Sequence, residues 1–493
     1  MNKGFTLIEL LTVIALIAIL YLIFFPTTIE HIRRTGQKID AANQIIIFDQ
    51  TKKYLSDNPY QYPKVEGNVY CIELQDLIYE GYLGDYLYDG TTKEKFDYQQ
   101  MIKVVYDEEF QFEIVDPRFC EEIIEEINFI DQSGATQPKL MGAMIPVIYN
   151  GGWITISPTE EWYDYNQKQW ANVVLIYPQK RDLYLDVTNV MIDDNDIMAH
   201  FVWIPRYRYK LFNSEKISLT NRTIDIKFEK DSEYGVEEWL THPAFTVNDS
   251  LDGFWVGKFS TTGNRYVPTI LGNQTMLIDL VAKNQYDAAK LIGINDYGIT
   301  GESRMMRNLE WGAIAYLSHS KYGHKEIWIN PNQDYITGCA YLERSSEATE
   351  ECDPYYSTNG GKASTTGNVY GVYDMSGGTW ERVLGALANQ DGSIMGLSSG
   401  FTTELTNQTF IDQVDVYDYS LDDDSFERSH LGDAMGESYN WYENYAMMPH
   451  DDNKSWVIRG GDYTLTTSSG IFAFAADNGG SGARSFRIVI PGN

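Results

Sequence analysis

An apolar run near the start of the chain restricts its fold and its location more than any other feature. Residues 5–25 contain a single ionisable side chain, that of Glu9. As a helix rising about 1.5 Å per residue, this stretch covers about 31 Å, which matches the hydrocarbon core of a bilayer. The sequence therefore predicts a membrane-spanning helix over 5–25.

The carboxylate of Glu9 is the unusual part of this run. A carboxylate inside a bilayer costs roughly 2.5 to 3.5 kcal/mol on insertion scales, so its presence there indicates a function. A secretory signal also places a basic residue, here Lys3, before an apolar core. This core is too long for such a signal, and no small-residue cleavage site follows Phe25. We therefore expect Glu9 to have a cationic partner.

The stretch from Gly4 to Leu11 resembles the type IV pilin family, whose members are cut after the glycine of a short basic leader and methylated on the new terminus. The resemblance makes residues 1–4 the leader, Phe5 the mature terminus and a prepilin peptidase a partner. It implies that the amine of Phe5 in one subunit neutralises Glu9 of its neighbour, and that Pro26 kinks the helix. A generic single-pass anchor is the alternative.

Charge and cysteine usage indicate the compartment. A net charge of −32 excludes nucleic acid as an expected partner, because phosphate binding needs a basic face. The acidity favours a soluble exterior and divalent cations. Four cysteines in an exported chain predict disulfides, with three connectivities open. We expect the sequence-local pairs, Cys71 with Cys120 and Cys339 with Cys352.

Beyond Pro26 the pattern becomes that of a polar helix that ends near residue 58. Ile29, Ile32, Ile39 and Ile46 recur on it at helical spacing. We interpret this stripe as the face that packs on a small sheet, as in a pilin.

A small antiparallel sheet follows. Residues 69–83 predict a short amphipathic helix closed by glycine, and alternating segments at 101–106 and 110–115 predict two strands. The predicted pilin-like module therefore spans 26–130, and a glycine-containing linker spans 131–138.

From residue 139 to 493 the chain is rich in tryptophan, tyrosine and glycine, which favours an α+β domain with long loops. Several stretches resemble the formylglycine-generating-enzyme and C-type-lectin-like (sulfatase-modifying-factor) superfamily, most strongly in residues 200–493. They are 201–207, 253–259, 308–313, 368–381, 459–463 and 485–488. The whole chain is thus predicted to be α+β: a long N-terminal helix with a small antiparallel sheet, then a large lectin-like domain with Trp311 and Trp380 in its core.

The superfamily's enzymes use two cysteines placed just after the stretch at 459–463. Leu465 and Gly470 stand at those positions here. Without thiolates there is no soft site for copper, so we expect neither copper nor formylglycine chemistry, and no enzyme. His319 and His324 flank Lys321 without a third ligand or a catalytic cysteine nearby, and we interpret them as surface or core histidines.

One glycine-rich turn offers hard oxygen ligands and matches the ligand positions of a calcium site in the superfamily. The predicted ligands are Asp374, the carbonyls of Gly377 and Thr379, and Glu381. In the alternative, Asp374 caps the turn and Glu381 pairs with Arg382 or Arg487.

Lectin-like folds bind sugars or proteins through loops near the final strands, so the resemblance also implies a ligand surface there. The residues expected on it are Trp456, Tyr463, Thr466, Phe472, Phe474 and Asn478.

The sequence thus predicts a pilin-like subunit that carries a non-catalytic adhesion domain for an extracellular glycan or protein. Such a bulky domain favours a minor or tip subunit over a major pilin. The chain would be a single-pass protein of the cytoplasmic membrane before assembly and a component of a cell-surface pilus afterwards. The alternative is a pseudopilin of a type II secretion or DNA-uptake system. A third and less favoured hypothesis is an enzyme with an unrecognised chemistry.

Overall fold

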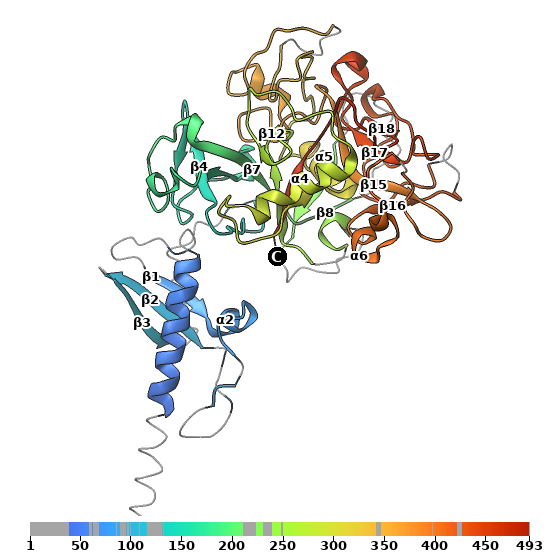
Figure 1. The fold of residues 1–493 in the computed structure, drawn as a ribbon. Coiled ribbons are helices and arrows are strands. Elements are labelled where there is room, and N and C mark those ends of the chain that lie inside the picture. The colour runs from blue at the N-terminus through green and yellow to red at the C-terminus, as the bar shows by residue number, and fades with distance from the viewer. Residues whose placement is uncertain are drawn as a thin grey trace, which may run out of the picture. The chain divides into compact units, whose positions relative to one another are not determined.

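The computed structural model describes residues 39–492 with several gaps, and the chain divides into two compact units, Met1–Asn128 and Phe129–Asn493 (Figure 1). The gaps are 59–61, 63–68, 85, 89–94, 96–97, 99, 108, 116–130, 132, 211–222, 230–238, 248–249, 342–346, 397 and 422–425. The predicted span 5–25, with Gly4, Phe5, Glu9 and Pro26, lies outside the described residues. Among the helices that are described, none is long and apolar enough to cross a membrane.

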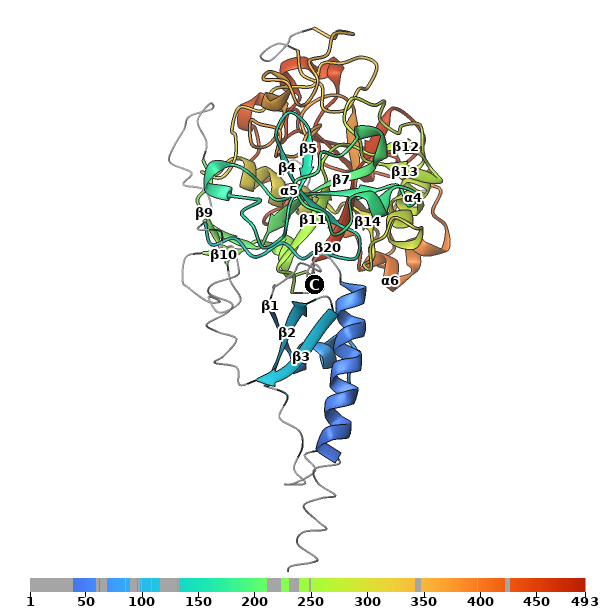
Figure 2. The same cartoon turned by 90° about the vertical axis from the view of Figure 1, so that its left-hand side faces the viewer.

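The longest described helix of the first unit covers residues 39–57 and runs along a three-stranded sheet (Figure 2). Ile47, Tyr54 and Leu55 are buried on its inner face and share a core with Ile102 and Val104 of the sheet. Positions seven to eight residues apart lie on the same side of an α-helix, so one face of it covers the sheet. The prediction of a helix packed on a sheet is confirmed for these residues.

The predicted stripe of isoleucines is wrong in the described part of this helix. Ile39 and Ile46 are each 38% exposed, and the neighbouring Ile45 is 63% exposed. Ile29 and Ile32 lie outside the described residues. The buried face of the helix is formed by Ile47, Tyr54 and Leu55. Ile39, Ile45 and Ile46 therefore point away from the sheet.

The sheet has the antiparallel order β1-β2-β3, with β1 at Val69–Glu73, β2 at Met101–Asp107 and β3 at Glu109–Val115. The two predicted strands are therefore confirmed. The predicted helix over 69–83 is wrong in its first part, because Tyr70 and Ile72 alternate inward and pair with β2. Helix α2 covers only Leu74–Tyr79, and Gly81 follows it at a φ of +77°.

Cys71 lies in β1 and is disulfide-bonded. Its predicted partner, Cys120, lies outside the described residues.

The second unit is rich in β structure and is built on two larger sheets. The first has seven strands in the order β14-β20-β11-β7-β6-β4-β5. Their bounds are β4 Ile145–Tyr149, β5 Trp153–Thr155, β6 Asn172–Ile176, β7 Ile197–Pro205, β11 Gly253–Gly257, β14 Arg304–Met305 and β20 Ile488–Gly492. The last strand of the chain thus pairs inside this sheet, next to β11.

The second large sheet has the order β16-β15-β17-β18, and β19 also pairs with β15. Its strands are β15 Trp380–Ala388, β16 Asp415–Asp418, β17 Trp456–Arg459, β18 Phe474–Asp477 and β19 Arg484–Phe486. Smaller sheets are formed by β8 Tyr207–Tyr209, β9 Ile226–Phe228 and β10 Leu240–Thr241, and by β12 Thr262–Asn264 with β13 Val267–Thr269. The α-helices among the described residues of this unit are α4 Ala282–Ile294, α5 Asn308–Ser318 and the short α6 Gln408–Ile411.

Helix α5 is buried along its whole length. Every residue from Asn308 to Ser318 is buried, and a Cβ on Gly312 would lie 1.8 Å from the carbonyl oxygen of Gly432. A side chain at position 312 would push the helix away from this neighbouring loop, so the close approach requires glycine. Trp311 on the same helix and Trp380 on β15 are 0% and 6% exposed, which confirms both as core residues.

The predicted linker is not a free connector in its second half. The Thr136 hydroxyl donates to the Asp252 carbonyl at 2.5 Å, and the Trp203 indole donates to the Thr136 carbonyl at 3.2 Å. Residues around Thr136 therefore belong to the packed second unit, where Trp203 pairs with Trp255 across β7 and β11.

Candidate functional site

The predicted calcium turn is a buried anchor of the fold. Asp374 is 3% exposed, and its carboxylate accepts N–H groups from Gly338 at 2.8 Å, Ser260 at 3.2 Å and the Asn330 side chain at 3.2 Å. Burial raises the pKa of Asp374 to about 6, although the Arg487 charge and these N–H groups act against the shift. The carboxylate thus faces hydrogen-bond donors on several sides.

Glu381 has the same character. Its side chain is buried in an ion pair with Arg487, with a distance of 3.0 Å from Nε to Oε2, and it also accepts from the Ser260 hydroxyl. The Thr379 hydroxyl donates to the Ala483 carbonyl, and Gly377 sits at a φ of +80°. Arg487 also donates to the carbonyls of Gly257 and Tyr373, so it joins β15, β11 and the loop before β15 at one buried point.

These surroundings do not fit a calcium ion between Asp374 and Glu381. A calcium ion needs six to eight oxygen ligands, whereas both carboxylates are already bonded to N–H, O–H and guanidinium donors. The alternative weighed from the sequence, with Glu381 paired to Arg487, is the arrangement found. Arg382 pairs with Asp477 instead, at 2.7 Å. Within the described ranges, no group of three or more His, Cys, Asp or Glu side chains forms a metal site.

The predicted ligand surface is wrong for three of its six residues. Trp456, Phe472 and Phe474 are at most 2% exposed and belong to the core. Trp456 on β17 stacks on Phe401, with ring centroids 5.4 Å apart. Tyr463, Thr466 and Asn478 are partly exposed, so they remain available to a ligand.

A cavity of about 150 Å³ lies beside this predicted surface and was not predicted. Five separate segments line it: the residue after α5, the loop 325–329, Ser376, the turn at 442–444 and the loop 469–471. The lining residues are His319, Lys325, Glu326, Ile327, Trp328, Ile329, Ser376, Tyr442, Asn444, Ser469, Gly470 and Ile471.

His319 was interpreted from the sequence as a surface or core histidine, and it is a buried residue in the cavity wall. Its Nδ1 lies 2.7 Å from the Ser318 hydroxyl and 3.1 Å from the Ala315 carbonyl, an acceptor that favours the proton on Nδ1. Its ring packs against Phe472 and Tyr442. Burial lowers the pKa of His319 to about 3, so the imidazole is neutral at physiological pH.

Asn444 and Gly470 fit closely together in the cavity wall. The Asn444 amide donates to the Ser469 carbonyl at 3.1 Å, and the Ser469 hydroxyl donates to the Asp462 carbonyl at 2.6 Å. A Cβ on Gly470 would lie 2.3 Å from Oδ1 of Asn444. A glycine at position 470 therefore lets the Asn444 amide lie in the wall.

Comparisons with known proteins identify the start of the chain. Residues 1–24 match the family described as the prokaryotic N-terminal methylation motif. The chain has a prepilin-type N-terminus. The match supports a type IV pilin or pseudopilin-like protein with processing by a peptidase, pilin partners, and a membrane-anchored state before the pilus surface.

A comparison with curated proteins finds no match for this prepilin-type chain. The structure of PvdO from Pseudomonas aeruginosa is similar over 59% of this chain and 94% of that chain, with 11% identity and a TM-score of 0.28. So low a TM-score leaves the resemblance of residues 139–493 to the lectin-like superfamily unconfirmed.

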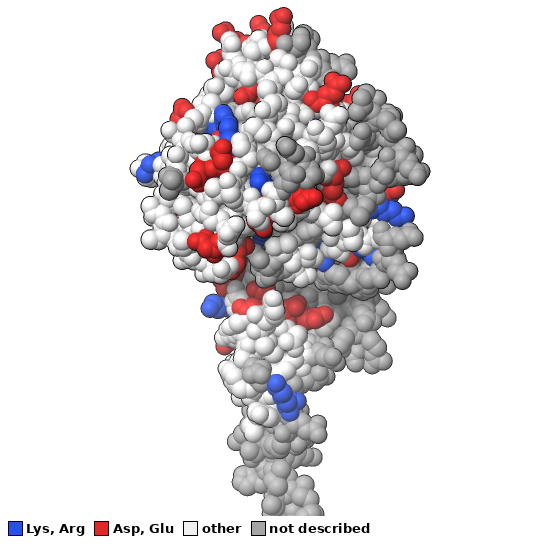
Figure 3. All heavy atoms as spheres, turned by 90° about the vertical axis from the view of Figure 1, so that its right-hand side faces the viewer, with Lys and Arg blue, Asp and Glu red and all other residues white. Residues whose placement is uncertain are grey.

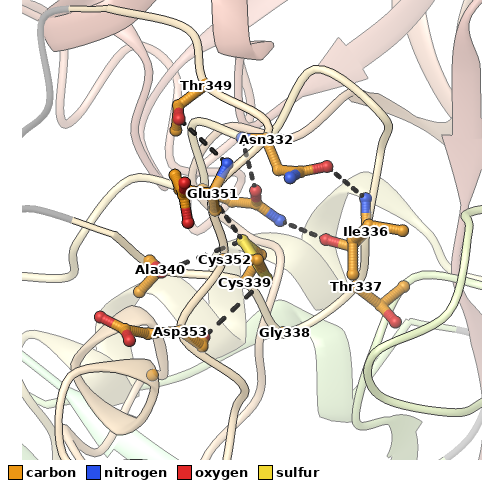
Figure 4. Close-up of a disulfide and its surroundings, with 12 residues drawn as sticks. Asn332, Ile336, Thr337, Gly338, Cys339, Ala340, Thr349, Glu351, Cys352 and Asp353 are labelled. Atoms are coloured by element: carbon orange, nitrogen blue, oxygen red, sulfur yellow. Dashed lines mark hydrogen bonds between the residues drawn. A yellow bond between two sulfur atoms is a disulfide. The ribbon is translucent and has the colours of Figure 1, made fainter.

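The predicted disulfide between Cys339 and Cys352 is confirmed (Figure 4). Asn332 braces the same loop, because its Oδ1 accepts from the backbone N–H groups of Asp334 and Ile336 and its amide donates to the Glu350 carbonyl. This loop also carries Gly338, a donor to Asp374. The disulfide therefore secures a loop that contacts the buried anchor.

Proposed function

We propose that this chain is a minor or tip subunit of a type IV pilus, and that its second unit is a non-catalytic ligand-binding module. The observation that carries the proposal is the methylation motif at residues 1–24. Phe5 would supply the amine that neutralises Glu9 of the next subunit, so a buried carboxylate would gain the partner it needs.

The exposed isoleucines of the first unit support a subunit that packs against neighbours. Ile39, Ile45 and Ile46 face outward near the start of the described helix. Exposed positions near its other end carry the polar side chains of Lys52, Lys53, Ser56 and Asp57. An apolar patch confined to the end nearest the apolar run is typical of an interaction surface.

The second unit supports the ligand-binding part of the proposal by its cavity and its surface. Acidic side chains are spread over the face shown in Figure 3, which suits an exterior that stays soluble. The cavity lining contains no cysteine, and its histidine is neutral, so the proposal assigns it binding and no chemistry. The ligand would be an extracellular glycan or protein.

The test measures the mature N-terminus of the chain and its occurrence in filaments, in cells that produce it. We expect the mature chain to begin with N-methylated Phe5 by mass spectrometry, and to occur in the sheared filament fraction. Glu9→Ala should be processed and yet be lost from that fraction, with Tyr266→Ala, in the exposed turn between β12 and β13, as control. Retention of Met1 to Gly4, or equal incorporation of Glu9→Ala, would contradict the proposal. Recovery with a secretion or DNA-uptake machine instead of a pilus would favour the pseudopilin alternative.

A further inference from the structure

The size of the cavity limits what can enter it. Its volume is about 150 Å³. An apolar cavity of about this volume holds one benzene ring. The cavity is partly open to solvent, so it has room for about one six-membered ring, whose substituents can extend outward.

The chemistry of the wall selects among such rings. Ile327, Ile329 and Ile471 offer apolar contact, while His319, Ser376, Asn444 and Ser469 are deeply buried polar side chains in the same wall. The hydroxyl and amide oxygens among them have lone pairs beyond the bonds they already make. A phenyl ring would cover these groups with hydrocarbon and form no hydrogen bond to their remaining lone pairs. A ring with C–H faces and hydroxyl groups around its edge satisfies both kinds of wall.

The charge of the wall is balanced. Lys325 and Glu326 carry opposite charges, and His319 is uncharged at physiological pH. Lys325 is also hydrogen-bonded to the Thr223 hydroxyl. An anionic sugar would bring a carboxylate into this space without a net counter-charge, which disfavours it.

We propose that the cavity binds one neutral hexose ring, as the end of a glycan, by stacking on the isoleucine wall and bonding to Ser376, Asn444 and Ser469. This inference rests on the ligand-binding role proposed above and specifies its ligand. It requires no calcium, because the carboxylates of the predicted calcium turn are bonded elsewhere.

The test uses the full-length chain in detergent and measures binding by titration calorimetry with and without EDTA. The probes are the methyl glycosides of glucose, galactose and mannose, with N-acetylneuraminic acid and N-acetyltyrosine amide as the anionic and aromatic arms. At least one neutral glycoside should bind saturably, with and without EDTA. Ile327→Trp, which fills the cavity from a half-buried position, and Ser376→Ala, which removes one hydroxyl, should each weaken it about tenfold. Tyr266→Ala should leave binding unchanged.

Four results would overturn the inference. They are binding of the tyrosine amide alone, tighter binding of the anionic sugar, loss of glycoside binding with EDTA, and no binding of any glycoside. So would unchanged binding by Ser376→Ala, which removes only a hydroxyl and tests the site even where Ile327→Trp does not fold. Filament incorporation is measured separately in cells. A failure of glycoside binding with normal incorporation therefore leaves the filament role standing, whereas a failure of incorporation does not affect the binding measurement.

Discussion

Two helices of this chain differ in how far their apolar side chains are buried. Helix α5 in the second unit is apolar on every side, and all of its residues are buried within that unit. The helix over 39–57 buries one face on its own sheet and leaves Ile45 63% exposed. Helix α5 is fully covered within its own unit. The helix over 39–57 instead retains apolar surface that a neighbouring subunit would cover. The comparison separates residues that stabilise one unit from exposed residues to which we assign a role in assembly as a proposal.

The largest effect is expected where α5 is most tightly enclosed. Trp311→Ala should lower the free energy of unfolding of the second unit by about 3 to 5 kcal/mol, because it removes a buried ring and leaves a cavity. All tryptophans lie beyond residue 128, so tryptophan fluorescence during urea unfolding reports this unit alone. Tyr266→Ala is the matched control. A loss smaller than about 1 kcal/mol would show that α5 is not the enclosed element described here.

The ion pair between Glu381 and Arg487 should give the next largest effect. Glu381→Gln removes the carboxylate paired with the buried Arg487 guanidinium, which keeps only the more distant charge of Asp374, and should lower the free energy of unfolding by about 3 kcal/mol. Adding Arg487→Met removes the unpaired charge but also the donors to the Gly257 and Tyr373 carbonyls, so it should restore only part of this loss. Equal or greater destabilisation in the double variant would contradict the account of this pair. Calcium should not change the unfolding midpoint of the parent chain.

A smaller effect should appear as pH dependence at His319. The pKa of His319 is about 3 in the folded chain and near 6.5 when unfolded, so the unfolded state binds the proton first as pH falls. Its contribution to stability is therefore present above about pH 6.5 and declines toward pH 3, by up to about 1.4 kcal/mol per pH unit. His319→Gln removes this proton uptake. The stability difference between parent and variant at pH 7 should narrow at pH 5, and a constant difference would contradict the buried neutral state.

Local patterns in the sequence predicted local structure well. The alternation around Met101 and Val115 gave the two strands, and the short spacing of Cys339 and Cys352 gave their disulfide. β1 was missed because it runs directly into α2, where Leu74 and Leu77 are spaced as on the buried face of a helix. The two elements were therefore predicted as one helix. The choice of Arg487 over Arg382 as partner of Glu381 depends on strand pairing, which sequence spacing does not contain.

The candidate site was harder to predict because its residues are far apart in the chain. The cavity is assembled from segments near residues 319, 327, 376, 443 and 470. Three of the four aromatic residues expected on a ligand surface, Trp456, Phe472 and Phe474, lie in β17, β18 and the segment before β18, where they are buried. Hydrophobic aromatic side chains fit a core and a ligand surface equally well, so residue type alone did not separate the two.

The comparison of the two helices is tested most directly on the exposed face of helix 39–57. Ile45→Asp and the control Lys53→Asp both change exposed positions, so each should alter the stability of the first unit by no more than about 0.5 kcal/mol, measured by circular dichroism. Their abundance in the sheared filament fraction of producing cells is the deciding measurement. The account predicts that Ile45→Asp is reduced at least about tenfold relative to Lys53→Asp, equivalent to about 1.4 kcal/mol of lost contact. Equal abundance of the two variants would contradict the claim that this face is covered by a neighbouring subunit.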